Sequence, residues 1–332
     1  MKLTIGIKAL NEEARIAAAL ESALAAAAPY GGQVVLADSG STDRTIAIAS
    51  TYPVRIVQLA DPLEKSCGTG AQLAFQHSDG EYFYLLDGDM VLDSGFLPEA
   101  LAFMEAHPTY AAVGGRVVEA NTDSLEYRIR ANTTRGGRNW APGDVDRLDC
   151  GGLYRRTAIQ QTGFLADRNL HAFEEFELGA RLRSLGWKLA RIDKPALLHF
   201  GHQTDSYALL WRRMKSGYSA ATGEVVRAAA GRKHFRQAVE LEHVRFGVVI
   251  ILFWLFLIAT VVMPMPLLVH ILLPIAALLA GFLFLLYRRG SASVALYSFT
   301  SWNVSALGLV TGFFRKRRQP KKPIDAVLIK EA

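Results

Sequence analysis

A short run of apolar residues that ends in two aspartates constrains the fold of this chain more than any other stretch. Tyr82 to Leu86 are five apolar residues in a row, and Asp87-Gly88-Asp89 follows them directly. Such a run is typical of a buried strand, and carboxylates at its end offer hard oxygen ligands to a divalent metal. Because Asp and Gly are also ordinary turn residues, a surface turn is the alternative.

Strand-like and helix-like segments alternate around this run. We expect strands at residues 3–7, 33–37 and 54–59, and helices at 12–28 and 70–77. This order predicts an α/β fold with a mostly parallel, Rossmann-like sheet. Ligands of such sheets bind outside the carboxyl ends of the strands. Asp38 and the pair Asp87 and Asp89 all follow strands, so they should lie at that edge, which favours the metal site over the turn.

The middle of the chain is less regular. A strand is expected at 111–118, and residues 121–146 are polar and arginine-rich, which fits either a substrate-covering loop or a solvated segment. Cys150 precedes two glycines that allow either a close ligand approach or a tight turn. It and Cys67 stand far apart without a pairing motif, which favours two free thiols in a reducing compartment.

A helix is expected at 173–185, with three glutamates in its first turn. Negative charge there suits the helix dipole, so a purely structural role is available. Three acids in four residues exceed what capping requires, and Glu174 and Glu175 are therefore candidates for catalysis.

From about residue 240 the chain becomes strongly apolar. Residues 244–263 and 267–287 are each long enough to cross a hydrocarbon core of roughly 30 Å, and residues 264–266 (Pro-Met-Pro) separate them. A third stretch, 294–314, carries several polar residues. A crossing there would place the basic residues 315–322 outside, against the positive-inside rule, so we expect an interfacial helix, with a third crossing as the alternative.

The predicted organisation is therefore a domain at 1–205, an amphipathic connector at 206–243, a membrane region at 244–314 and a basic tail at 315–332. The net charge of +6 owes much to the clusters at 288–289 and 315–322. These clusters suit an anionic membrane surface. No recognition motif supports nucleic acid as a partner. The N-terminus lacks a signal peptide, so the first two-thirds should stay in the cytoplasm.

Four segments together resemble family 2 glycosyltransferases over roughly residues 3–205. They are Ile5 to Glu12, Val35 to Thr45, Leu85 to Asp89, and the acidic stretch Phe173 to Leu178 with Arg181 after it. The resemblance implies a GT-A fold, a nucleotide-diphosphate sugar as donor and inversion at the anomeric carbon. It also implies a divalent cation, Mg²⁺ or Mn²⁺, because the leaving diphosphate develops negative charge.

The resemblance also implies roles for individual residues. Asp89 is expected to bind the metal, and Asp87 to contact the ribose or a metal-bound water. Asp38 should accept hydrogen bonds from the base, beside Asn11 and Glu12. The glycines Gly68 and Gly70 belong to a donor loop in which Thr69 replaces the family's frequent basic residue.

Two assignments stay open at this stage. Glu175 occupies the position of the family's catalytic aspartate and is the expected base, with Glu174 as its rival. His199 and His202 follow a strand-like stretch at 195–198. They supply either a further metal or diphosphate contact or a purely structural histidine pair.

These features predict a membrane-anchored, metal-dependent inverting glycosyltransferase of the bacterial inner membrane, with its catalytic domain facing the cytoplasm. Its acceptor would be lipid-linked, in polysaccharide or glycolipid biosynthesis. A polyprenyl-phosphate glycosyltransferase is the alternative within this class. An inactive nucleotide-binding membrane scaffold is the alternative of another class.

Overall fold

The structure is a computed structural model that describes residues 2–120, 137–201 and 205–332. The chain divides into two compact units. The sheet unit comprises Met1–Ser206 together with Arg317–Ala332, and the helical unit comprises Tyr207–Lys316. Each unit is described by itself below.

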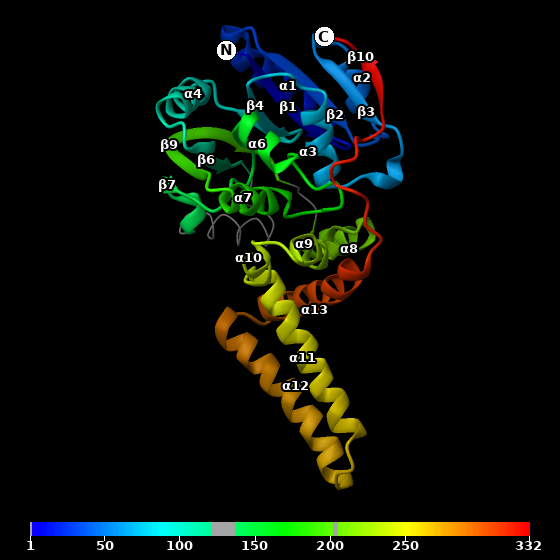
Figure 1. Cartoon of the computed structure of the whole chain (residues 1–332). Helices are drawn as coiled ribbons and strands as arrows, with labels where there is room; N and C mark the ends of the chain where they lie inside the picture. Colours follow the sequence, from blue (N-terminus) through cyan, green and yellow to red (C-terminus); the bar gives the residue numbers. More distant parts are fainter. Residues whose placement is uncertain (1, 121–136, 202–204) are drawn as a thin grey trace. The chain divides into compact units, whose positions relative to one another are not determined.

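A mixed sheet organises the first unit (Figure 1). Its parallel half follows the order β3-β2-β1-β4, formed by β1 (Leu3–Ala9), β2 (Gln33–Asp38), β3 (Arg55–Leu59) and β4 (Tyr82–Asp87). The sheet continues through β8 (Gly152–Arg155), β6 (Tyr110–Glu119), β9 (Lys188–His199) and β5 (Met90–Leu92), and β7 (Gly143–Asp144) pairs with β9. The predicted α/β fold with a mostly parallel, Rossmann-like sheet is confirmed for the strands around the opening run.

Alternation along β4 explains why its run is entirely apolar. Tyr82, Tyr84 and Leu86 belong to one buried cluster, and Phe83 and Leu85 belong to the cluster on the other face. A strand covered on both faces reads as a continuous hydrophobic run. The covering helices are α1 (Ile16–Ala27), α2 (Thr45–Ala49), α3 (Cys67–Gln76), α4 (Phe96–Ala106), α6 (Arg156–Thr162) and α7 (Glu174–Ser184).

The sheet gains an edge strand from the other end of the sequence. β10 (Ala326–Lys330) pairs antiparallel with β3, and Figure 1 shows it at the edge of the sheet. The interpretation of residues 315–332 as a basic tail is therefore corrected for this segment. Five residues next to a charged cluster carry too little local pattern to reveal a partner strand far away in sequence.

The helical unit contains α8 (Ser206–Ser216), α9 (Ala221–Ala229), α10 (Phe235–Val239), α11 (Glu242–Val262), α12 (Leu267–Arg289) and α13 (Ala292–Phe314). Gly217, with a φ of 83°, separates α8 from the next turn, and the predicted connector at 206–243 contains α8, α9 and α10. Among the described residues, α11 and α12 are the helices long and apolar enough to cross a membrane, by length and composition alone.

The third apolar stretch, α13, packs closely on α9 and the turn before it. A Cβ added at Gly308 would lie 1.9 Å from the Ser219 carbonyl oxygen, and one at Gly312 would lie 1.9 Å from that of Ala220. The Arg315 guanidinium lies 2.6 Å from the buried Glu224 carboxylate. Close helix packing thus explains the small residues of α13. The expectation that this helix lies in the membrane interface stays a prediction.

Candidate active site

A buried lysine joins two of the predicted site carboxylates. The Lys8 ammonium lies 2.7 Å from Glu174 Oε1 and 3.3 Å from Asp87 Oδ1. Lys8 and Asp87 are register partners at the carboxyl ends of the parallel strands β1 and β4. Glu174 begins α7 directly after Phe173, whose φ of 65° turns the chain into the helix. Register and a sharp turn therefore bring together residues 166 positions apart in sequence.

The charges of this group depend on one another. Burial alone lowers the pKa of Lys8, but attraction by Asp87 and Glu174 outweighs it and raises that pKa well above its usual value. Burial raises the pKa of Asp87, and the Lys8 charge offsets part of this rise. Lys8 is therefore a fixed cation that permits two carboxylates to stand side by side.

A second group lies where β5 and β6 flank the end of β9. His199 Nε2 lies 3.5 Å from Asp89 Oδ2, and the Glu119 carboxylate accepts a hydrogen bond of 2.7 Å from His199 Nδ1. His199 is the register partner of Glu119 in β6 and of Met90 in β5. The bond to Nδ1 directs the other ring nitrogen toward Asp89, the arrangement in which a carboxylate orients a metal-binding imidazole.

Asp89 and His199 fit as ligands of one cation. Two ligands of a metal at 2.0–2.2 Å, about 90–110° apart, are separated by about 3–3.5 Å, and the observed gap is 3.5 Å. No group of three or more His, Cys, Asp or Glu side chains that could hold a metal occurs among the described residues. A cation here would need further oxygens, which a diphosphate can supply. His202 lies outside the described residues.

Glu175 is held differently from its neighbour Glu174. Its carboxylate accepts hydrogen bonds from the backbone amides of Cys150, at 3.3 Å, and Gly151, at 2.9 Å. Both of those residues have positive φ, 65° and 84°, so Cys150 and Gly151 form a tight turn that holds this side chain. Burial, followed by the nearby charge of Glu174, raises the pKa of Glu175 to about 8.

The structure places Asp38 away from solvent. Its side chain is fully buried, and Oδ2 accepts hydrogen bonds from Gly40 N, Ser41 N and Gln58 Nε2. Oδ1 is buried as well and hydrogen-bonds to no described residue. Asp38 therefore shapes its loop, and the predicted contact with a base would require that loop to open.

Asn11 and Glu12 lie at the same edge of the sheet. Asn11, with a φ of 57°, accepts a 2.8 Å hydrogen bond from Thr42 N and so connects β1 to the loop after β2. A Cβ added at Gly88 would lie 3.0 Å from Glu12 Cγ. Glu12 thus packs against the turn that separates Asp87 from Asp89.

The predicted donor glycines form the first turn of α3. A Cβ at Gly68 would lie 2.0 Å from the Asp167 carbonyl oxygen, and one at Gly70 would lie 3.1 Å from Lys8 Cβ. Only glycine fits at Gly68 without displacing backbone. Cys67 stands in the same turn as a free thiol, and burial together with Glu174 raises its pKa to about 12, so it stays protonated.

Sequence reasoning missed Lys8 and Glu119. Lys8 stands within the apolar strand Leu3–Ala9, and a lysine inside a buried strand is itself a signal of a buried partner. Glu119 carries no such signal, because only the pairing of β6 with β9 brings it to His199. Of the predicted substrate-covering loop, residues 121–136 lie outside the described residues. Near its end, Arg191 stacks on Trp140 at 4.6 Å.

Comparison with known proteins agrees with this geometry. Residues 4–163 match the family model described as glycosyl transferase family 2. A curated relative, the putative glycosyltransferase EpsE of Bacillus subtilis (strain 168), is 28% identical over 117 residues. That match covers 34% of this chain and 42% of EpsE, so the chain spans less than half the length of this relative.

Solved structures of similar fold include a mannosyltransferase and the protein TarS. The mannosyltransferase PcManGT from Pyrobaculum calidifontis, in complex with GDP-Man and Mn²⁺, is 19% identical with a TM-score of 0.59, covering 93% of this chain and 85% of its own. TarS 1–349 of S. aureus, in complex with UDP-GlcNAc, is 16% identical with a TM-score of 0.50, covering 73% of this chain and 77% of its own. Residues 4–163 are therefore similar to glycosyl transferase family 2, and the sheet unit has the GT-A type of fold.

Proposed function

We propose that the chain is a metal-dependent, inverting glycosyltransferase that moves a sugar from a nucleotide-diphosphate donor to a lipid-linked acceptor. The observation that carries the proposal is the pair of groups at one edge of the sheet. Asp89 and His199 form one group with the chemistry of a cation site, and Lys8, Asp87 and the two glutamates form the other. The family assignment supports the reaction class.

The donor would bind between these groups and the first turn of α3. Asp89 and His199 would hold Mg²⁺ or Mn²⁺, which supplies neutralisation of the charge that develops on the leaving diphosphate. Asp87 would face the ribose, with its carboxylate oriented by Lys8 at 3.3 Å. The relatives in complex with GDP-Man and Mn²⁺ and with UDP-GlcNAc support a nucleotide-sugar donor.

Glu175 is the proposed general base. Glu174 lies 2.7 Å from Lys8 and is held as its counter-ion, whereas Glu175 forms no ion pair within the described part of the chain. A pKa of about 8 places Glu175 near the range in which a base is effective at neutral pH. It would take the proton of the acceptor hydroxyl as the oxygen attacks the anomeric carbon from the face opposite the leaving diphosphate.

The apolar helices α11 and α12 support an acceptor that resides in the membrane. Both are long and apolar enough to span a bilayer, and a soluble acceptor would not require such an anchor. The proposal includes placement in a bacterial inner membrane with the sheet unit in the cytoplasm, where nucleotide sugars are made.

Donor binding and base chemistry can be tested separately. Full-length protein in nanodiscs is titrated with UDP, GDP and their sugars in Mn²⁺, and then supplied with either a lipid-linked glycan or polyprenyl phosphate. Transfer to a hydroxyl acceptor that Glu175→Gln abolishes supports the proposal. Transfer to polyprenyl phosphate that survives this substitution identifies the alternative, because a phosphate acceptor needs no strong base. Nucleotide binding without transfer to either acceptor would contradict both and favour the inactive nucleotide-binding scaffold.

A further inference from the structure

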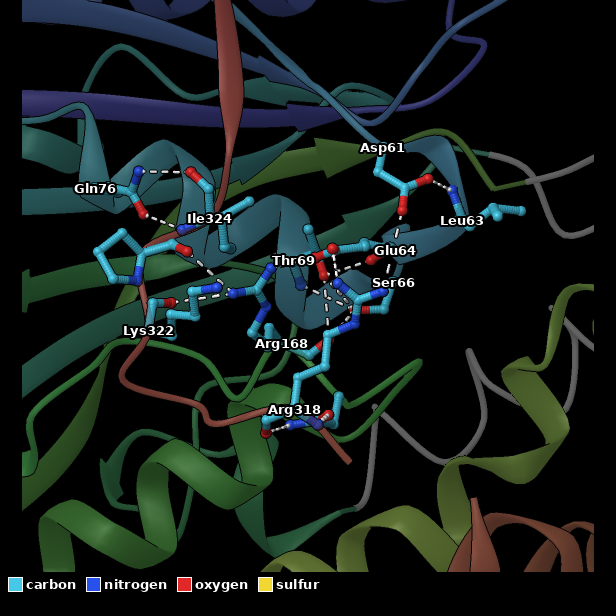
Figure 2. A network of polar contacts seen from close by, with 12 residues as sticks. Asp61, Leu63, Glu64, Ser66, Thr69, Gln76, Arg168, Arg318, Lys322 and Ile324 are labelled. Carbon is cyan, nitrogen blue, oxygen red and sulfur yellow. Dashed lines mark hydrogen bonds and ion pairs between the residues drawn. The ribbon is translucent and has the colours of Figure 1, made fainter. Parts of the chain in front are cut away.

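Residues 317–324, termed the strap, lead into β10 and lie on the sheet unit. The strap contacts two segments. One is residues 60–70, termed the donor loop, which ends in the first turn of α3. The other is the loop of residues 167–170. Figure 2 shows this network of ion pairs and hydrogen bonds. The family match ends at residue 163, so the strap lies outside it.

Arginines of the strap neutralise buried or half-buried acids of both loops. Arg317 forms an ion pair with Asp167, which is fully buried, and Arg318 forms one with Glu64. Arg318 also lies 4.0 Å from Asp61. Glu64 is shared with Arg168, and burial lowers the pKa of that guanidinium. The arginines of the strap are thus engaged by the protein, and placement of the cluster at 315–322 on a membrane surface stays a prediction.

Hydrogen bonds to the main chain fix the strap at both ends. At one end, Arg318 N donates to Asn169 Oδ1 at 2.7 Å, and Asn169 Nδ2 donates to the Arg318 carbonyl at 2.9 Å. At the other, Gln76 of α3 pairs with the amide and carbonyl of Ile324 at 2.8 and 2.9 Å. Between them, Arg168 donates to the carbonyl oxygens of Lys322 and Pro323. The position of the strap is therefore specified by bonds rather than by apolar contact alone.

The loop that the strap holds in turn fixes the first turn of α3. The Arg168 carbonyl accepts hydrogen bonds from Ser66 Oγ, at 2.9 Å, and Thr69 Oγ1, at 3.1 Å. Gly68 N donates to the Leu170 carbonyl at 2.9 Å. The next glycine, Gly70, packs against Lys8. A continuous series of contacts thus runs from the strap to the lysine that organises the active site.

We propose that Arg317 and Arg318 are positioning residues for nucleotide-sugar binding, a proposal that rests on the proposed function. They hold the donor loop in place and cancel the charge of Asp61, Glu64 and Asp167. A donor diphosphate approaching α3 would otherwise meet Asp61 and Asp167 without these cations and Glu64 paired with Arg168 alone. Like charges repel most strongly where water is excluded. The strap thereby carries a determinant of donor affinity far in sequence from the family domain.

The test compares Arg317→Gln/Arg318→Gln with Lys321→Gln/Lys322→Gln, which removes the same charge from the same segment. Full-length protein in nanodiscs is titrated with UDP and with GDP in Mn²⁺ by calorimetry. Hydrogen exchange of residues 66–70 is measured in the same samples, together with exchange of β1 and β4 as a check on the fold. Arg318→Gln alone serves if the double variant does not fold, because the Arg318 side chain is half-exposed.

The proposal predicts at least tenfold weaker nucleotide binding and at least tenfold faster exchange at residues 66–70 in the arginine variant, with β1 and β4 unchanged. The lysine variant should stay within twofold of wild type, and Arg317→Lys/Arg318→Lys should recover most of the nucleotide affinity and most of the exchange protection at residues 66–70. Nucleotide affinity and exchange both within twofold of wild type in the arginine variant would overturn the proposal. If wild type binds neither nucleotide, the proposed function fails instead, and the exchange comparison still decides whether the strap positions the donor loop.

Discussion

The Lys8 ammonium lies 2.7 Å from Glu174 Oε1, and this ion pair separates the roles of two adjacent glutamates. Glu174 is the counter-ion of a buried cation. Glu175, one residue later, points to the amides of Cys150 and Gly151 and keeps a raised pKa. The first turn of α7 therefore contains one residue that organises the site and one that is suited to accept a proton.

Replacing Glu175 should remove chemistry without removing donor binding. Glu175→Gln preserves the size of the side chain and one of its two hydrogen bonds from backbone amides. It cannot accept a proton, so we expect kcat to fall by about 10²–10⁴-fold. The Kd of the nucleotide should remain within about threefold of wild type, since the Gln is nearly isosteric. Glu174→Gln is the matched variant and should weaken donor binding as well, because it releases Lys8. A Glu175→Gln enzyme with wild-type turnover of a hydroxyl acceptor would show that another group is the base.

The pH dependence of activity follows from the direction in which the pKa of Glu175 is shifted. Its pKa rises from 4.5 to about 8 in the folded chain, so the carboxylate form that a base requires appears only as pH rises. We expect kcat/KM to increase up to about pH 8 and then level off. A profile that is already flat at pH 6 would contradict this assignment.

The raised pKa of Glu175 also makes the stability of the folded protein depend on pH. A raised folded pKa contributes stability that is fully present below pH 4.5 and lost as pH rises through about 8. Wild type should therefore lose thermal stability relative to Glu175→Gln across that window. Melting temperatures of metal-free protein measured between pH 5 and 9 check this, and parallel curves for the two proteins would speak against it.

Lys8 should matter for stability far more than another lysine at the same strand. Lys8→Met leaves the buried Glu174 and the partly exposed Asp87 without their cation, for which we expect a loss of about 3 kcal/mol in the free energy of unfolding. Lys2→Met removes an exposed pair with Asp79 and should cost less than about 1 kcal/mol. Denaturant unfolding of both variants makes the comparison, and equal losses would contradict the buried-cation role.

Glu119 should affect metal affinity without touching the metal. Glu119→Gln loosens the orientation of His199, and losses of outer-shell partners of this type weaken metal binding by about 10–100-fold. Glu99→Gln, at an exposed ion pair with Lys194, is the control and should leave affinity unchanged. Titration of Mn²⁺ in the presence of UDP, followed by electron paramagnetic resonance, reports the difference. Indistinguishable Mn²⁺ affinities would mean that His199 is not a ligand.

Sequence alone predicted the part of the candidate site that depends on local pattern, namely strand β4 and the aspartates that follow it. The apolar run of β4 and the aspartates after it identify the edge of the sheet, since a parallel sheet places its loops there. Lys8 and Asp87 meet because β1 and β4 are adjacent in register, which follows once their pairing is known.

The remainder depends on contacts between distant segments. The pairing of β6 with β9 brings Glu119 to His199, and that of β10 with β3 carries the strap across the donor loop. The pattern of apolar and polar residues within one strand does not indicate which distant strand it pairs with. Asp38 is a different case: its burial and its bonds to Gly40 and Ser41 show a loop-forming role that its sequence position did not indicate, and its contact with the base stays a prediction.

The most direct test of the central claim is Mn²⁺-dependent release of nucleoside diphosphate from a panel of UDP- and GDP-sugars by full-length protein in its native membranes. Wild type should release the diphosphate from at least one donor only when Mn²⁺ or Mg²⁺ is present, and Asp89→Asn should reduce that rate by at least about 100-fold. Release that is unaffected by chelation of the metal, or that is equal in Asp89→Asn and wild type, would contradict a metal-dependent glycosyltransferase at this site.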